Sequence, residues 1–561
     1  MSSIFAIFDL GTRGMYAQQT ALNVTGHNIA NANTEDYVRQ RAELRESAPF
    51  DSVPGQLGSG VDVERIIRIK DEFTDYQIRK ESQTLGYLEE KNVILQQLEN
   101  IFNEPSDNGL NTLINNFYDS LHDLQNHPED FSARVMVKEQ ALAMTDAFNS
   151  TYQKMSELED NLDEKIEFKV DEINTITSEI ARLNNQIAKT EAGGLQDAND
   201  LRNRRDVLLR DISKMGNTFI EEGKDGVVNV QLGDQLVVSG VKAIALETSR
   251  NDDGSTKIVT ENGFNLTVKN GSLKALVETR DEIMTTYMDS LNSLANSMID
   301  EINDVHVGGV GLTMFQSTTS ESAVLATGVP LANAGLDFDV NGGSFTLSLY
   351  DSNGNLKSET AITVNPFVNT LEDIAASIGA IPGFEATITG DKKLTISTST
   401  PTDQFSFVAD TGSVADTSNF IKAMGFNTFF KGSDARTITV SSAIVNDVNK
   451  IAAASSTATG DNSNVLKIIA TRDEPLIQDA TFEAYFSSMI GGLGVERQVV
   501  NAREETQGVI LQTLQERQQA ESGVSFDEEA VNLIRYQRGY QAAAKFVQVI
   551  DGLIQSLINM V

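Results

Sequence analysis

The sequence contains no cysteine, no tryptophan and only four histidines among its 561 residues. Because cysteine is absent, the chain can form no disulfide, offers no thiolate to a metal ion and has no cysteine nucleophile. It also contains no run of about 18 or more apolar residues, so the sequence predicts no transmembrane helix. These absences leave few side chains for cofactor binding or covalent catalysis, and we expect no cofactor, no metal and no catalytic residues.

Two sequence motifs that resemble ligand sites are incomplete. The glycine-rich residues 491–494 lack both a following lysine and a preceding strand, so they indicate a break in a helix and not a phosphate-binding loop. His122 and His127 are five residues apart, whereas two zinc ligands on one helical face need a spacing of four. Neither motif predicts a functional site.

The other candidate ligands also have simpler interpretations. Residues 251–254, Asn-Asp-Asp-Gly, resemble part of a calcium loop, but Thr260 stands where the last acidic ligand would be. We therefore expect a hairpin turn there. His27 and His306 are isolated histidines, and we expect each on a helix surface or in a loop.

The chain is strongly acidic. It has 80 Asp and Glu against 44 Lys and Arg, a formal charge of −36. Such a surface repels nucleic-acid phosphates and anionic lipid headgroups, so we expect neither nucleic acid nor a membrane as partner. The N-terminus has no basic segment, and Asp9 and Arg13 interrupt its apolar part, which argues against a cleaved secretory signal. A cytoplasmic protein and one exported without a cleaved signal both fit.

Both ends of the chain show the periodicity of amphipathic helices. Ser525 precedes Glu528 by three residues, a spacing that predicts the start of a helix over residues 526–561. Apolar seams that reach the end of a chain need a covering surface, either from the chain's own domain or from neighbouring copies. We expect the following residues to form this assembly seam: Ile4, Phe8, Met15, Leu22, Tyr540, Val547, Ile550, Ile554 and Leu557.

The interior changes character along the chain. Residues 85–215 carry long helical patterns, including about 55 residues without proline that end before Gly193. Residues 218–271 predict short strands with Asn-Gly and Asp-Gly turns, and a helix is predicted over 272–305. Residues 310–460 are rich in Ser, Thr and Gly and predict strands with one helix near 370–379.

The fold class predicted is α+β multidomain: paired terminal helices forming a coiled coil, a long helical bundle with a small β subdomain, and an inserted β-rich outer domain. The layout is nested. Residues 1–45 with 515–561 form the terminal domain, 46–312 with 460–514 the bundle with the β subdomain 218–271, and 313–459 the outer domain.

One short segment after the first helix carries a resemblance. It reads Ala30-Asn31-Ala32-Asn33-Thr34 and is followed by Tyr37, and its asparagines predict that the helix ends there. The segment resembles the motif that follows the N-terminal helix in the axial proteins of the bacterial flagellum. The C-terminal stretches at 529–533 and 536–545 are similar to the same family.

Three internal stretches, at 127–134, 199–206 and 460–464, make the chain most similar to the hook-associated branch of that family. The resemblance covers roughly residues 1–310 and 460–561. The sequence departs from the family at one position: a Gly usually precedes the Tyr, and here Glu35 and Asp36 precede Tyr37. Since Gly alone takes positive φ without strain, the shape of this loop is open.

The resemblance implies a structural role at the junction between hook and filament, outside the cell, after export through the flagellar type III channel. It implies copies packed in a ring or tube through their terminal helices, the hook protein below and a second junction protein, hook-associated protein 3, above. It also implies an export chaperone on the C-terminal helix. Alternatives are another axial protein, such as the hook protein, or an enzyme or ligand-binding module within residues 310–460.

Overall fold

The computed structural model describes residues 2–34, 36–52, 55–106, 109–194, 196–223, 225–251, 254–409, 416–458 and 460–559. Two compact units share the chain. The first contains residues 1–94, 161–281 and 498–561, and the second contains 95–160 and 282–497. Both combine long helices with small sheets, as the predicted α+β multidomain class requires. The nested three-part division has other boundaries and stays a prediction.

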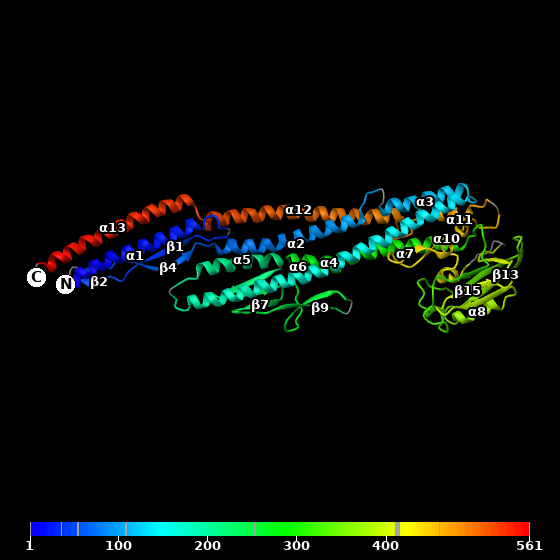
Figure 1. Ribbon diagram of the computed structural model, residues 1–561, viewed down its shortest axis with the longest axis horizontal. Helices are drawn as coiled ribbons and strands as arrows, with labels where there is room; N and C mark the ends of the chain where they lie inside the picture. The colour runs from blue at the N-terminus through cyan, green and yellow to red at the C-terminus, as the bar shows by residue number, and fades with distance from the viewer. Residues whose placement is uncertain are drawn as a thin grey trace. The chain divides into compact units, whose positions relative to one another are not determined.

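The two ends of the chain form antiparallel helices that contact each other in the first unit, α1 (Ser2–Ala30) and α13 (Phe526–Ile558) (Figure 1). The hydroxyl oxygen of Ser525 accepts a hydrogen bond from the Glu528 N–H at 3.5 Å, so the predicted start of α13 is confirmed. The strands after α1 were not predicted from the sequence. Four strands follow it, of which the long pair also contacts α1: β1 (Gln40–Glu46), β2 (Phe50–Ser52), β3 (Gly55–Leu57) and β4 (Val61–Arg68).

Long helices make up much of the rest of the first unit. The predicted helix of about 55 residues is confirmed as α4 (Phe131–Glu191), which has 61 residues and contributes to both units, like α2 (Glu72–Phe102) and α12 (Phe482–Ser522). Strands predicted within 218–271 are present, and β9 pairs with β10 antiparallel, while residues 252 and 253 of the hairpin turn expected at 251–254 lie outside the described residues. The remaining elements are α5 (Asn199–Met215), β5 (Thr218–Glu222), β6 (Val228–Leu232), β7 (Gln235–Ser239), β8 (Lys242–Ala243), β9 (Leu246–Arg250), β10 (Thr256–Thr260) and α6 (Ser272–Glu278).

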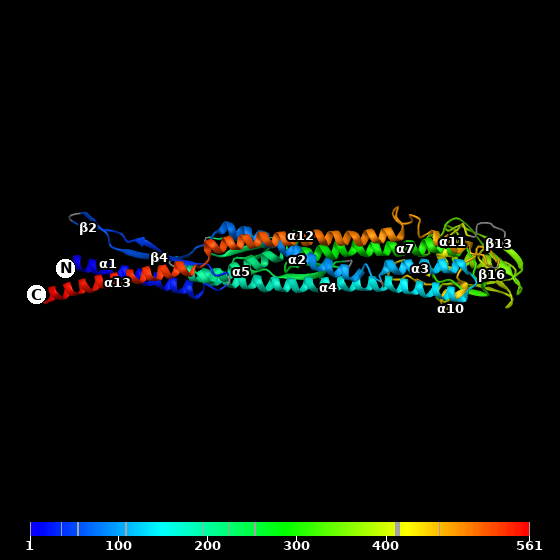
Figure 2. The same cartoon turned by 90° about the horizontal axis from the view of Figure 1, so that it is seen from above.

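The helix break predicted at residues 491–494 is wrong. These residues lie inside α12, which is continuous from Phe482 to Ser522 (Figure 2). Leu493, among the glycines, is fully buried, so tertiary packing overrides the low helix propensity of glycine. The helix predicted over 272–305 is present, but a π-helical turn at Thr279–Met284 separates α6 from α7 (Thr285–Val307).

The second unit combines a helical part with the predicted β-rich region. Two three-stranded antiparallel sheets and α8 (Leu371–Gly379), the helix predicted near 370–379, enclose a core rich in phenylalanine. Its elements include α3 (Leu110–Asn126), β11 (Ser317–Thr319), β12 (Gly343–Tyr350), β13 (Leu356–Val364), β14 (Phe384–Ile388), β15 (Leu394–Thr398), β16 (Gln404–Ser406), α9 (Phe420–Met424), β17 (Phe430–Lys431), β18 (Thr439–Val440), α10 (Ser442–Asn446) and α11 (Ser463–Ala470).

The expectation that His306 lies on a surface or in a loop is wrong. His306 lies in α7 with 1% of its surface exposed. Its Nδ1 is 2.7 Å from the Asn427 carbonyl oxygen, and its Nε2 accepts a hydrogen bond from the Ala452 N–H at 2.9 Å. A lone histidine in sequence gave no sign of this, because its partners come from loops more than a hundred residues away.

Within the part of the chain that the structure describes, no helix is long and apolar enough to span a membrane.

Candidate functional site

The segment after α1 is held by Asn28, a buried residue in the last turn of the helix. Its side-chain Nδ2 donates to the Gln40 carbonyl oxygen at 2.9 Å, and its Oδ1 accepts from the Gln40 N–H at 3.0 Å. The amide of Asn28 therefore pairs with the first residue of β1 as a neighbouring strand would. This pair fixes where the chain turns back from α1 to the hairpin.

Residues of the predicted motif make the turn between Asn28 and Gln40. The Tyr37 hydroxyl lies 3.0 Å from both Asn28 Oδ1 and His27 Nδ1, and burial raises the pKa of the Tyr37 phenol, with smaller contributions from nearby carboxylates. Asn31 Nδ2 donates to the His27 carbonyl oxygen at 2.9 Å, which caps the end of α1. The Thr34 N–H donates to the Asn31 carbonyl oxygen at 2.9 Å.

The motif residues thus divide into two groups. Asn31, Thr34 and Tyr37 build the turn, while the side chains of Ala30 and Asn33 are exposed. The resemblance identified these positions, but the sequence carried no sign that Asn28 and Gln40 would pair.

Asp36 resolves the open question of the loop shape. Its φ is +59°, in the left-handed region, so the backbone before Tyr37 takes the geometry that a glycine would adopt freely. The Asp36 carboxylate accepts a hydrogen bond from the Arg210 guanidinium on α5, and this ion pair holds a residue that would otherwise be strained. Glu35 lies outside the described residues.

We expect Asp36→Gly to leave the free energy of unfolding within about 1 kcal/mol of wild type, because relief of the left-handed backbone offsets the lost ion pair. Asp36→Val loses the same pair without that relief and should be about 2 kcal/mol less stable. Urea unfolding followed by circular dichroism measures both. Equal losses in the two variants would contradict the importance of the backbone angle.

Ion pairs connect this segment to other elements of the first unit. Arg39 contacts Glu529 through Nε at 2.7 Å and Glu528 through Nη1 at 2.8 Å, which ties the segment to the first turn of α13. Glu529 is almost fully buried, so this pair is one of the more constraining contacts between the two ends of the chain. No motif in the sequence marked Arg39.

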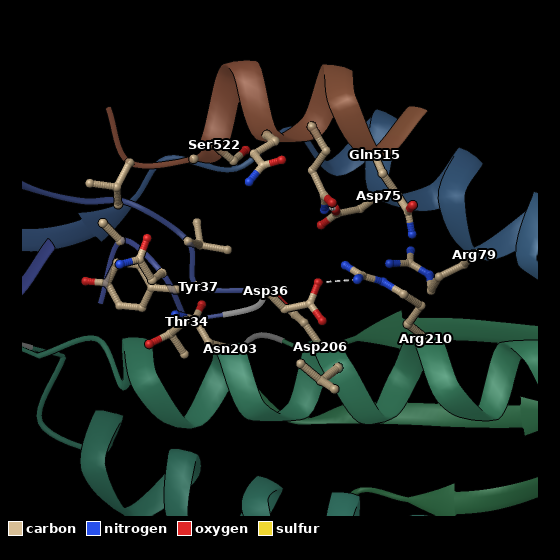
Figure 3. Close-up of a pocket in the computed structure, with 18 residues that line it drawn as sticks. Thr34, Asp36, Tyr37, Asp75, Arg79, Asn203, Asp206, Arg210, Gln515 and Ser522 are labelled. Atoms are coloured by element: carbon tan, nitrogen blue, oxygen red, sulfur yellow. Dashed lines mark hydrogen bonds and ion pairs between the residues drawn. The ribbon is translucent and has the colours of Figure 1, made fainter. Parts of the chain in front are cut away.

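A cavity of about 490 Å³ opens between this segment, α2, α5 and the end of α12 (Figure 3). Its wall is polar, and it contains three aspartates and two arginines among the described residues. Burial alone would raise the pKa of the Asp206 carboxyl, but the charges of Lys70 and Arg68 outweigh it and hold this pKa at about 2. No group of three or more His, Cys, Asp or Glu side chains within the described ranges is placed to hold a metal ion.

The pairing of α1 with α13 depends on small residues. A β-carbon at Gly11 would lie 2.8 Å from Val547 Cγ2, and one at Gly14 would lie 4.0 Å from Ala543 Cβ. The two helices can approach closely at these positions because glycine has no side chain. The seam predicted from the sequence contains only large apolar side chains and therefore none of these small residues.

The predicted seam residues lie on both helices. Ile550 is 8% exposed, the most buried of them. Phe8, Met15, Leu22, Tyr540, Val547 and Ile554 are half-buried, and the side chains of Ile4 and Leu557 lie outside the described part. On α1 the most buried apolar residues are instead Ala17, Ala21 and Val24.

Large apolar side chains remain exposed on the two paired helices. On α13 several recur at steps of three or four residues, so they share one side of the helix. These exposed residues are Phe5, Ile7 and Tyr16 on α1, and Phe526, Val531, Ile534, Phe546, Val549, Leu553 and Ile558 on α13. We call this set the exposed apolar stripe.

Three protein-family models match separate parts of the chain. Residues 95–318 match the flagellar hook-associated protein FlgK helical domain. Residues 8–37 match the flagella basal body rod protein family, and residues 517–560 match the flagellar basal body rod FlgEFG protein C-terminal family. The terminal matches include the turn after α1 and most of α13.

Related proteins align with this chain over its whole length. Flagellar hook-associated protein 1 of Bacillus subtilis is 27% identical, and the alignment covers 100% of this chain and 99% of the relative. The Escherichia coli protein of the same name is 25% identical over 98% of each chain. The solved structure of the flagellar hook junction protein FlgK from Burkholderia pseudomallei has a TM-score of 0.53 at 15% identity and covers 80% of this chain and 100% of that chain, which shows a shared fold.

These relatives are flagellar structural components, and none is an enzyme. The helical domain and the full-length relatives point to hook-associated protein 1, and both terminal segments match families of flagellar rod proteins, which are also axial components. The chain is similar over its full length to flagellar hook-associated protein 1, and it is a structural, axial component of the bacterial flagellum.

Proposed function

We propose that this chain forms the junction between hook and filament by self-assembly of its terminal helices. The observation that carries the proposal is the exposed apolar stripe on α1 and α13. Contiguous exposed apolar side chains are unfavourable in water, and on paired helices they are typical of surfaces that other subunits cover. The two helices pack against each other, and the exposed apolar side chains that remain are left for neighbouring copies to cover.

The proposed partners follow from the family. Copies of the chain would form a ring or tube, with the hook protein on one side and hook-associated protein 3 on the other. The chain would travel through the flagellar type III export channel to the outside of the cell, and its lack of cysteine leaves no disulfide to block threading. An export chaperone would bind the C-terminal helix, whose exposed apolar side chains suit a helix-binding groove.

An axial protein of another position, such as the hook protein, is the alternative. The full-length similarity to hook-associated protein 1 relatives favours the junction. An enzyme or ligand-binding module in the β-rich region has no support in the comparisons.

We expect Leu553→Asp to reduce incorporation at isolated hook ends by at least about tenfold, which corresponds to about 1.4 kcal/mol. Leu553 is 53% exposed on α13, so the single chain tolerates the charge, whereas an interface that buries it does not. Binding of labelled protein to purified hooks, counted by electron microscopy, measures the effect.

Gln555→Asp is the matched control, because Gln555 is an exposed polar residue two positions along the same helix. It should incorporate normally. Ile554→Asp, at a half-buried position of the predicted seam, should also prevent incorporation. Normal incorporation of Leu553→Asp, with circular dichroism equal to wild type, would refute self-assembly through α13.

A further inference from the structure

The cavity beside the motif segment contains an arginine that has no ionic partner among the described residues. Arg79 of α2 lines the cavity and makes no ion pair or side-chain hydrogen bond with the described part of the chain. Figure 3 shows its guanidinium group reaching across the cavity toward that of Arg210. Two like charges that converge in this way favour a negatively charged group between them.

The other charges of the wall are already balanced. Lys70 Nζ lies 2.8 Å from Asp75 and 2.7 Å from Asp206, and Arg68 Nη1 lies 2.7 Å from Asp206. These two cations therefore neutralise the two aspartates of the wall on α2 and α5. They lie within about 4 Å of their partners, where an opposite charge dominates.

Arg210 pairs with Asp36 and Arg79 is left over. Lys70 and Arg68 do not line the cavity but pair with its aspartates, and when they are counted with Arg79 and Arg210, four cations meet the three carboxylates of the wall, which leaves one positive charge in surplus. A phosphate dianion would overcompensate this surplus and meet the three aspartates, whereas a carboxylate carries one charge and suits the planar fork of a guanidinium.

Two further polar atoms at this wall lack partners. The Nδ2 of Asn203 and the hydroxyl of Ser522 are buried and have no hydrogen-bond partner in the described structure. Buried polar groups are paired in the great majority of native proteins, so an additional group or water is expected here. Both residues line the same cavity as Arg79.

We infer that the cavity is a binding site for a single carboxylate group held between Arg79 and Arg210. The carboxylate belongs either to a small organic acid in solution or to an acidic side chain of a neighbouring copy. A carboxylate from a neighbouring copy rests on the proposed self-assembly, whereas a small organic acid does not. A chain with 80 Asp and Glu supplies such side chains in abundance wherever copies meet.

Arginine footprinting tests the inference. The free protein is treated with phenylglyoxal in sodium acetate or sodium succinate, with sodium chloride at the same ionic strength as reference, and the modified peptides are quantified by mass spectrometry. At four times the Kd, a carboxylate should slow modification of Arg79 about fivefold. Arg503, an exposed arginine on α12, is the internal control and should react equally in all three salts.

A second arm uses protein assembled on hook ends without added organic acid. Protection of Arg79 there, but not in the free chain, assigns the carboxylate to a neighbouring copy, while protection by acetate or succinate in the free chain assigns it to a small acid. The same carboxylate should also protect Arg210 from modification, in the free chain or in the assembled protein. The Arg79→Gln variant should abolish this protection of Arg210. If the protein did not assemble on hook ends, the acetate and succinate arm could still be measured on the free chain. A failure of the proposed function can therefore be told apart from a failure of this inference.

Three results would overturn the inference. One is equal reactivity of Arg79 in all salts and in the assembled state. Another is slow modification of Arg79 in the free chain when sodium chloride is the only salt, together with faster modification in Glu35→Gln. The charge of Arg79 would then be neutralised by a carboxylate of the chain itself. The last is protection of Arg503 to the same degree as Arg79, which would show a general salt effect.

Discussion

Gly86→Ala should lower the free energy of unfolding of the first unit by about 3 kcal/mol, although alanine is the better helix former by about 1 kcal/mol. Gly86 lies in α2 against the last turn of α5. A β-carbon there would be 2.2 Å from the Lys214 carbonyl oxygen and 2.8 Å from the Lys214 Cγ. The backbone oxygen cannot rotate away as a side chain would, so the two helices must move apart along their contact.

The consequence reaches the cavity, because α2 and α5 carry Arg79 and Arg210. Urea unfolding monitored by circular dichroism would measure the loss. Gly508→Ala is the matched control: it lies in α12 in the same unit, and no atom lies within 4 Å of its added β-carbon. It should raise stability by up to about 1 kcal/mol. A Gly86→Ala protein as stable as Gly508→Ala would disprove the close packing of α2 on α5.

The second large effect is a loss of stability of the second unit in acid, caused by His306. Burial lowers the pKa of His306 to about 4, the hydrogen bond to the Asn427 carbonyl opposes this, and the charge of Arg134 adds to it. Protonation of Nε2 would also break the hydrogen bond from the Ala452 N–H. In the unfolded chain the imidazole has its ordinary pKa of about 6.5.

Between these two pKa values the unfolded state binds more protons than the folded state, so stability falls as pH falls. The stability due to neutral His306 is present above pH 6.5. About 2 kcal/mol of it is lost by pH 5 and about 3 kcal/mol by pH 4. His306→Gln should be less stable than wild type at pH 7 but should lose less stability on acidification.

Urea midpoints at pH 7, 5 and 4 for wild type and His306→Gln measure this difference, which cancels the titration of carboxylates common to both proteins. His122→Gln, at an exposed histidine of α3 in the same unit, should follow the wild-type profile. If His306→Gln and wild type changed in parallel, the buried neutral imidazole would not be the cause.

Much of the fold was predictable because the elements are long and regular. The 61 residues of α4, the start of α13 after Ser525 and the strands between 218 and 260 follow local periodicity and local capping. The strands between 40 and 68 were missed because their two sides differ little in polarity and much of their surface is exposed.

The candidate site was predictable only in part. The asparagines after α1 predicted the end of the helix, and the family resemblance identified Tyr37. Both predictions were possible because they depend on one short segment of the sequence. That Asn28 would pair with Gln40 and that Arg79 would face Arg210 depends on which segments pack together. Such pairings depend on contacts between residues far apart in sequence, for which a single sequence has no period or motif.

The sequence by itself determined the acidic charge, the absence of thiol chemistry, the helical ends and the family resemblance, because these depend on composition and on neighbours within a few turns. The tertiary structure alone decided that residues 491–494 are helical, that His306 is buried and that Asp36 takes a left-handed backbone. In each case packing or an ion pair with a distant residue outweighs a local preference of about 1 kcal/mol.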